Sequence, residues 1–434
     1  MDTKNQEIYN SKLVDVEEAI NKINHGDTVI LDMGCCEAIG IEEAIVKHYE
    51  RFRDVEFYQM IVCGDTPFAD PKYAGHFRYN SLFASSSNRK AIAMGYADYT
   101  PCFFYEMPEV IRDIIKPRVS ICSVCPPDEN GYVSLGANVD YIGSTLDYCE
   151  VKIAQVNKYV PRTLGGAVRH ISEFDCLVEI DRELPEVPSI PLTDVEKAIG
   201  KNCASLINDG DCIQLGIGGI PNAIAAELTH KKDLGLHSEM VGDGVVDLIK
   251  SGVINNSKKN IDTGKTVISF CFGTRKLFDF IDNNPDVLLE PIEVVNHPLT
   301  VAKIDNFVSV NSCVQVDLMG QVVSDSVGYT QISGVGGQVD FVRGAALSKG
   351  GKSIIAMPSS AKGGTVSKIV ATIDDGAAVT TSRNDVDYII TEYGIARLKG
   401  LSLRERAKAL IGIAHPNFRA ELEQAYEKRF NQKL

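Results

Sequence analysis

A sequence pattern that occurs twice places the strongest constraint on the fold of this chain. Residues 15–39 read D-V-E-E-A-I-N-K-I-N-H-G-D-T-V-I-L-D-M-G-C-C-E-A-I, and residues 194–224 repeat the same order of elements with five extra residues in the first helix. The loop glycines Gly34 and Gly218 then align. Each copy is typical of a helix, a Gly-Asp turn, a buried strand, a glycine loop and a second helix. The repeat favours a duplicated domain, although α/β proteins also reuse such a pattern by chance.

The rest of the chain fits two α/β domains. A length of 434 residues exceeds what one hydrophobic core usually organises. Residues 184–192 contain three prolines and predict an extended linker, so we expect domains at 1–187 and 188–434. Short β-branched runs alternate with helical stretches, which predicts open sheets rich in parallel strands. The predicted strands are 28–33, 56–62, 118–123, 152–156, 176–180, 212–216, 267–271, 353–357 and 387–391, and the predicted helices are 38–50, 221–231, 244–251, 299–304 and 402–412, with helices closing the chain to Phe430.

Composition excludes several classes of protein. The net charge of −14 makes nucleic acid an unexpected partner, because a duplex-binding protein needs a basic face. No run of 18 apolar residues predicts a membrane span, and the N-terminus lacks the apolar core of a signal peptide, so we expect a cytoplasmic protein. The twelve cysteines are then expected to be reduced thiols. Cys122 and Cys125 form a C-x-x-C without a matching second pair, which favours a structural role over metal or redox use.

The loop from Gly216 to Ile220 follows a predicted strand and opens a predicted helix. Its sequence G-I-G-G-I-P has Pro221 where a dinucleotide fingerprint needs a third glycine, which argues against a nicotinamide cofactor. Proline is acceptable in the first turn of a helix. The loop exposes backbone N–H groups at a helix N-terminus and suits an oxyanion. The alternative is a tight strand–helix turn that binds nothing.

Several residues outside that loop are further candidates for a functional site. Glu239 follows a second short strand and stands before Gly-Asp-Gly, where it predicts either a solvated strand end or a nucleophile. A second glycine cluster at 333–337 and the loop around Lys362 could each approach a ligand or lie in solvent. His237, His297 and His415 form no triad and are expected to be structural. No metal-binding motif occurs.

In order along the chain, several segments together resemble the acyl-CoA:carboxylate CoA-transferases of the acetyl-CoA hydrolase/transferase family. The resemblance covers essentially the whole chain and implies two related open α/β domains, in agreement with the repeat. The segments are G-I-G-G-I-P-N-A-I (216–224), H-S-E-M (237–240), F-G-T-R-K-L-F-D-F (272–280), N-S-C-V-Q-V-D-L-M-G-Q (311–321), S-G-V-G-G-Q-V-D-F (333–341), S-S-A-K-G-G-T-V-S (359–367), T-E-Y-G-I-A-R-L (391–398) and I-A-H-P-N-F-R (413–419).

The resemblance implies that Glu239 attacks an acyl-CoA thioester and becomes a glutamyl-CoA thioester, which a second carboxylate resolves. It implies that the backbone N–H groups of Ile220 and Gly337 stabilise the oxyanions. It also implies that coenzyme A is a substrate and that no metal or permanently bound cofactor is needed. The positions that match coenzyme A-binding residues of the family are Gly216, Ile217, Gly218, Gly219, Ile220, Val314, Gly337 and Lys362.

Substrate and assembly follow from the same resemblance. We expect acetyl-CoA or butyryl-CoA as the donor and a short-chain acid, 4-hydroxybutyrate, as the acceptor. The loop around Gly34, Cys35 and Cys36 is expected to form part of the wall of the acid pocket, and the assembly is expected to be a homodimer or a dimer of dimers. A thioester hydrolase on the same fold and a non-catalytic coenzyme A or nucleotide sensor remain alternatives. Acids that differ by one methylene are separated by only about 1–3 kcal/mol.

Overall fold

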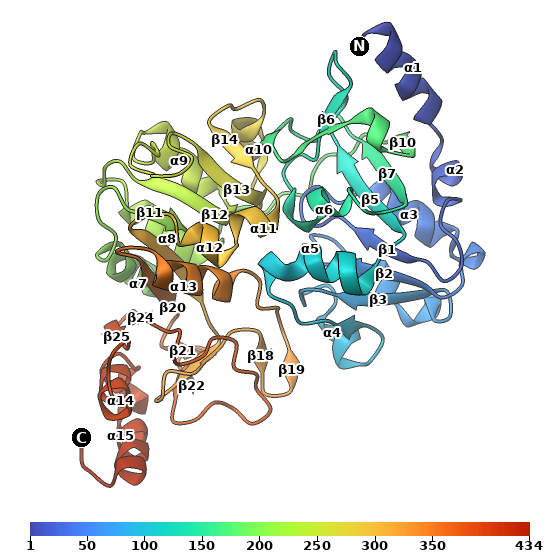
Figure 1. The fold of residues 1–434 in the computed structure, drawn as a ribbon. Helices are drawn as coiled ribbons and strands as arrows, with labels where there is room; N and C mark the ends of the chain where they lie inside the picture. Colours follow the sequence, from blue (N-terminus) through green and yellow to red (C-terminus); the bar gives the residue numbers. More distant parts are fainter. The chain divides into compact units, whose positions relative to one another are not determined.

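The computed structural model describes residues 1–434 and divides into two compact units (Figure 1). Unit 1 comprises Met1–Pro188 and Val267–Val295, and unit 2 comprises Ser189–Thr266 and Asn296–Leu434. The segment Val267–Val295 thus belongs to unit 1, although it follows the proline-containing linker. The predicted domains 1–187 and 188–434 follow from the sequence repeat, and they stay a prediction.

Unit 1 is built on a seven-stranded sheet in the order β10-β7-β5-β1-β2-β3-β4, in which all neighbouring strands are parallel. Parallel strands buried on both faces read as continuous apolar runs, and all six residues of β5 are buried. The strands are β1 (Thr28–Leu31), β2 (Val55–Gln59), β3 (Phe77–Ser81), β4 (Asp98–Tyr99), β5 (Val119–Val124), β7 (Val151–Val156) and β10 (Cys176–Glu179).

Helices and smaller strands complete unit 1. Helix α2 packs on α3 and β10, and α6 packs on β5. The helices are α1 (Thr3–Lys12), α2 (Val16–Ile20), α3 (Ile39–Lys47), α4 (Arg89–Ala93), α5 (Met107–Val110), α6 (Asp140–Thr145), α10 (Arg275–Ile281) and α11 (Ile292–Val295). The smaller strands are β6 (Tyr132–Ser134), β8 (Leu164–Gly165), β9 (Val168–His170), β13 (Thr266–Cys271) and β14 (Val287–Leu289).

Unit 2 contains the strand order β25-β24-β20-β15-β11-β12, which is parallel except for the β24–β25 hairpin. The connections from β15 to β20 and from β20 to β24 contain two small antiparallel pairs and the strands of a three-stranded sheet. The main strands are β11 (Cys212–Gln214), β12 (Gly235–Val241), β15 (Phe307–Ser312), β20 (Lys352–Ala356), β24 (Tyr388–Thr391) and β25 (Gly394–Arg397). The smaller strands are β16 (Gln315–Asp317), β17 (Val322–Val323), β18 (Ser326–Val327), β19 (Thr330–Gln331), β21 (Ser360–Ala361), β22 (Val366–Ser367) and β23 (Ile369–Val370).

The helices of unit 2 cover this sheet and close the chain. Helix α7 packs on α8 and β24, α13 packs on β15 and β20, and α14 packs on α15 and β25. They are α7 (Asp194–Ala204), α8 (Gly219–Glu227), α9 (Asp243–Lys250), α12 (Pro298–Val301), α13 (Gln338–Leu347), α14 (Leu403–Gly412) and α15 (Pro416–Phe430). None of the helices of the chain combines the length and apolar character needed to cross a membrane.

The two sheets share a strand order, as the sequence repeat predicts. In unit 1, β1 lies between β5 and β2, and in unit 2, β11 lies between β15 and β12. All nine predicted strands and all five predicted helices are present, with ends shifted by a few residues. One difference concerns the candidate nucleophile, because β12 continues to Val241 and Glu239 therefore lies inside the strand.

Buried carboxyl groups cluster at the carboxyl end of β1. Asp32 accepts hydrogen bonds from the backbone N–H groups of Ala38 (3.0 Å) and Ser123 (2.6 Å). Glu42, on α3, accepts one from the Gln59 amide at 3.3 Å. Burial raises the pKa of Asp32 and raises that of Glu42 to about 7. Folding therefore holds Glu42 largely neutral at a pH where it would ionise in water.

We predict that replacing Glu42 by glutamine makes the stability less dependent on pH. A glutamate in the unfolded chain ionises near pH 4.3, and one unit of pKa shift corresponds to about 1.4 kcal/mol. Between that pH and about 7 the unfolded chain loses the proton while the folded chain keeps it, so stability falls as the pH rises. The urea midpoint of Glu42→Gln should therefore fall less from pH 5 to pH 8 than that of the wild type. The exposed Glu7→Gln is the control, and equal slopes for Glu42→Gln and the wild type would contradict the prediction.

Candidate functional site

The loop after β11 lies next to the strand that carries Glu239. Cys212 pairs with Gly235 and Ile213 with Leu236, and continuing this parallel register places Gly216 opposite Glu239. The Ser238 hydroxyl fixes the two segments at this point, since it donates to the Leu215 carbonyl at 2.9 Å. The predicted loop and the predicted nucleophile are thus neighbours at the carboxyl edge of one sheet, where open α/β sheets bind ligands.

The loop ends at the start of helix α8, where backbone N–H groups have no hydrogen-bond partner within the helix. Gly218 precedes α8 with φ +104°, a conformation that L side chains rarely adopt, and no side chain caps the helix. Gly219 and Ile220 occupy the first turn of α8, where N–H groups have no partner within the helix. A Cβ at Gly219 would lie 1.7 Å from the Glu196 carboxylate, whereas space is open at Gly218. The space beside the backbone is therefore open at Gly218, while the Glu196 carboxylate lies against Gly219.

Two donors hold the carboxylate of Glu239. The Asn296 side-chain amide donates to Oε2 at 2.7 Å, and the backbone N–H of Gly337 donates a second hydrogen bond. Burial raises the pKa of Glu239 to about 7, and both hydrogen bonds oppose that shift because they stabilise the ionised form. Near neutral pH the carboxyl group is thus partly ionised and more basic than an ordinary glutamate.

Asn296 was not predicted from the sequence. Its side chain is fully buried, and its amide nitrogen also donates to Asp340 at 3.3 Å. Because both N–H groups of the amide are committed to carboxylates, its orientation is fixed. Its only sequence signal is the tripeptide N-H-P, in which a histidine is the more usual catalytic side chain. His297 caps α12 by accepting the backbone N–H of Leu299, as expected of a structural residue.

Gly337 allows the backbone of unit 2 to reach the carboxylate. It caps the ten-residue helix α13, so the positive end of the helix dipole faces Glu239. A Cβ at this position would lie 1.9 Å from Glu239 Oε2 and 2.2 Å from Asn296 Nδ2. Any larger residue would displace the carboxylate from its two donors.

Val314 and Lys362 follow neighbouring strands of the same sheet. Val314 stands just after β15 and donates its N–H to the Val323 carbonyl at 2.8 Å. Lys362 is exposed at the turn of the β21–β22 hairpin, which follows β20. Since β20, β15 and β11 are adjacent, the segments with Lys362, Val314 and Gly216–Ile220 leave the carboxyl edge of one sheet, whereas Gly337 reaches the site from the start of α13.

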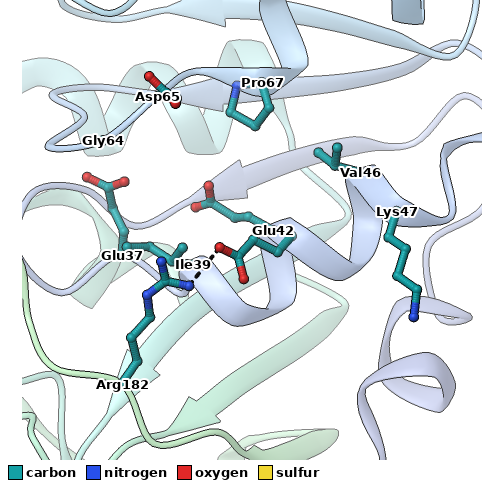
Figure 2. A pocket seen from close by; sticks show the side chains of 10 residues that line it. Glu37, Ile39, Glu42, Val46, Lys47, Gly64, Asp65, Pro67 and Arg182 are labelled. Carbon is teal, nitrogen blue, oxygen red and sulfur yellow. Dashed lines mark hydrogen bonds and ion pairs between the residues drawn. The ribbon is translucent and has the colours of Figure 1, made fainter.

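Unit 1 differs at the loop that corresponds to this site. A Cβ at Gly34 would lie 2.7 Å from the Asn138 amide and 3.0 Å from the Phe272 ring, so the space beside this glycine is filled. Cys35 and Cys36 are buried. The residues that follow this loop line a cavity of about 500 Å³, and Glu37 and Glu42 form part of its wall (Figure 2). No group of three or more His, Cys, Asp or Glu side chains is placed to hold a metal ion.

Comparison with known proteins agrees with this architecture. The acetyl-CoA hydrolase/transferase N-terminal domain matches residues 1–191 and the C-terminal domain of the same family matches residues 273–426. A 4-hydroxybutyrate coenzyme A transferase from Clostridium kluyveri is 51% identical over 98% of this chain and 99% of its own length.

Solved structures show the same relationship. RipA from Yersinia pestis is 36% identical with a TM-score of 0.93, and the match covers 99% of both chains. A 4-hydroxybutyrate CoA-transferase from Porphyromonas gingivalis is 39% identical with a TM-score of 0.86, covering 98% of this chain and 100% of that one. With both domains matched in order and the glutamate site in place, the chain belongs to the acetyl-CoA hydrolase/transferase family.

Proposed function

We propose that this protein transfers coenzyme A between an acyl-CoA and a short-chain carboxylate, with Glu239 as the nucleophile. The observation that carries the proposal is a single carboxylate held by Asn296 and Gly337 beside the bare loop that starts at Gly216. A half-buried glutamate with a pKa of about 7 is both available as an anion at neutral pH and more basic than usual. The names of the similar transferases from C. kluyveri and P. gingivalis support the activity and point to 4-hydroxybutyrate as the acid.

The reaction needs four displacements. Glu239 attacks the thioester carbonyl, the C–S bond breaks, and an acyl-glutamyl anhydride and the coenzyme A thiolate result. The thiolate attacks the glutamyl carbonyl carbon, the anhydride C–O bond breaks, and the acyl group leaves as its carboxylate. A second carboxylate then attacks the glutamyl-CoA thioester, and the two steps run in reverse to regenerate Glu239 and release the new acyl-CoA. A carboxylate is a weak nucleophile. Binding energy from the distant nucleotide portion of coenzyme A must therefore be used to raise the reactivity of the thioester.

The two proposed oxyanion donors serve different carbonyl groups. Gly337 N–H already contacts the Glu239 carboxyl group, so it is suited to the oxyanion that forms on the glutamyl carbon when thiolate attacks. Asn296 donates to Oε2 of the same carboxyl group. Ile220 N–H, at the start of α8, is left for the oxyanion of the acyl group. One such donor is typically worth about 3 kcal/mol in the transition state.

Coenzyme A is proposed to lie along the carboxyl edge of the unit 2 sheet. Backbone N–H groups of Gly216–Ile220 and the segment at Val314 would contact its pantetheine arm and thioester. The exposed ammonium of Lys362 suits a phosphate group. We further propose that the protein is cytoplasmic and assembles as a homodimer or a dimer of dimers. Its role would lie in fermentative short-chain acid metabolism. Its two domains, 1–187 and 188–434, would descend from one duplicated domain.

We predict that the purified protein converts butyryl-CoA and 4-hydroxybutyrate into 4-hydroxybutyryl-CoA and butyrate. Chromatography of the coenzyme A species would follow the reaction, with acetate as a second acceptor. Equal loss of one thioester and gain of the other is the expected result. Release of free coenzyme A at a rate independent of the added acid would instead identify a hydrolase, and an untouched thioester would identify a binding protein.

Trapping the intermediate tests the assigned nucleophile. Incubation with butyryl-CoA followed by borohydride should reduce a glutamyl thioester to an alcohol, and peptide mass analysis should find the loss of mass at Glu239. Glu239→Gln should show neither the modification nor transfer, while keeping the wild-type circular dichroism spectrum. An unmodified Glu239 peptide in protein that turns over butyryl-CoA would place the nucleophile elsewhere.

Removing the Asn296 amide should change the pH profile as well as the rate. Its hydrogen bond lowers the pKa of Glu239, so Asn296→Ala should raise that pKa and move the acidic limb of kcat/KM to higher pH. The maximal rate should fall on the order of tenfold to a thousandfold, as expected for the loss of a transition-state donor. Asn417→Ala, at an exposed site in unit 2, is the control. A lower rate with an unmoved acidic limb would show that Asn296 does not act on Glu239.

A further inference from the structure

Two cysteines of unit 1 face each other across neighbouring strands. The parallel register of β1 and β2 pairs Ile30 with Tyr58 and continues beyond the strands as a bridge between Gly34 and Val62. One step further along, the same register places Cys35 beside Cys63, and their Sγ atoms are 4.0 Å apart. Neighbouring strands lie about 4.8 Å apart, which is within the Cα separation of about 4.4–6.8 Å found in disulfides. The backbone thus already has the spacing that a disulfide needs.

The two thiols differ in their surroundings. Cys63 is partly exposed and precedes the exposed residues Gly64 and Asp65, so a small oxidant can reach it. Cys35 is buried, and its contact with Cys63 together with burial raises its pKa. The next thiol, Cys36, is also buried and accepts a hydrogen bond from the Ala137 N–H at 3.2 Å. Cys63 is therefore the entry point for an oxidant, and Cys35 is the partner within reach.

We propose that Cys35 and Cys63 are a modification site that closes into a reversible disulfide. A low-molecular-weight disulfide is attacked by the Cys63 thiolate, which forms a mixed disulfide and releases one thiol. Cys35 then gives up its proton, its sulfur attacks the Cys63 sulfur, and the second thiol leaves. Two protein thiols are oxidised and one small disulfide is reduced to two thiols. Excess small thiol runs both steps backwards.

Formation of the Cys35–Cys63 disulfide would change the wall of the neighbouring cavity. The two sulfur atoms must move from 4.0 Å to bonding distance, which is about 2.05 Å. The Cys63 N–H donates to Glu37 Oε1 at 2.7 Å, so movement of Cys63 is transmitted to that carboxyl group. Glu37, Gly64 and Asp65 all line the 500 Å³ cavity, and Figure 2 shows the Glu37 carboxyl group directed toward the Gly64 segment. The oxidation state of the pair thereby sets the shape of one cavity wall.

The test reads a covalent bond and does not depend on the proposed transfer activity. The full-length native protein is incubated with oxidised glutathione, free thiols are alkylated, and the digest is analysed by mass spectrometry. The expected product is a cross-linked peptide pair containing Cys35 and Cys63, which has lost two hydrogen atoms and disappears on addition of reduced glutathione.

Three variants sharpen the result. Cys35→Ser should accumulate a glutathione adduct on Cys63, Cys63→Ser should give neither adduct nor cross-link at these positions, and Cys36→Ser should keep the cross-link. Thermal unfolding of each reduced variant checks the fold. The proposal is overturned if wild-type Cys63 stays free, if its glutathione adduct persists to the same extent as in Cys35→Ser, or if the bond joins Cys35 to Cys36.

Discussion

The geometry of the candidate site in unit 2 depends on how one half-buried carboxylate, that of Glu239, is held by two hydrogen-bond donors. Burial alone would favour the neutral acid, and the hydrogen bonds from Asn296 and Gly337 restore part of the ionised form. The result is a group whose pKa lies near neutrality, which makes it a stronger base than exposed glutamates while leaving it ionised often enough to react. Two contacts support these donors: Asp340 accepts a hydrogen bond from the Asn296 amide, and Gly337, at the start of helix α13, donates its N–H to the carboxylate.

Side-chain packing distinguishes the two similar loops of units 1 and 2. The same strand order places Gly34 and Gly218 at equivalent points of their sheets. Beside Gly34 the space is occupied by Asn138 and Phe272, but beside Gly218 it is open. The loop of unit 1 therefore has the same turn without the open space, and its neighbourhood contains buried carboxyl and thiol groups instead.

Local patterns predicted the strands and helices well, because buried parallel strands and capped helices have strong periodic signals. They also placed Glu239 beside the glycine loop, since parallel register follows from strand order. Asn296 escaped notice because it meets Glu239 only after the chain has passed through 57 further residues, a spacing that no periodicity encodes. The burial of Asp32 and Glu42 was likewise hidden, because carboxylates in sequence normally indicate a surface.

The tight approach at Gly337 also bears on how relatives of this chain should be interpreted. A substituted residue there could leave both sheets and the glutamate intact, yet it would push the carboxylate off its donors. Overall sequence identity and even an aligned glutamate are then insufficient evidence of catalysis. A single position without a side chain can separate working enzymes from relatives that have kept the fold and lost the reaction.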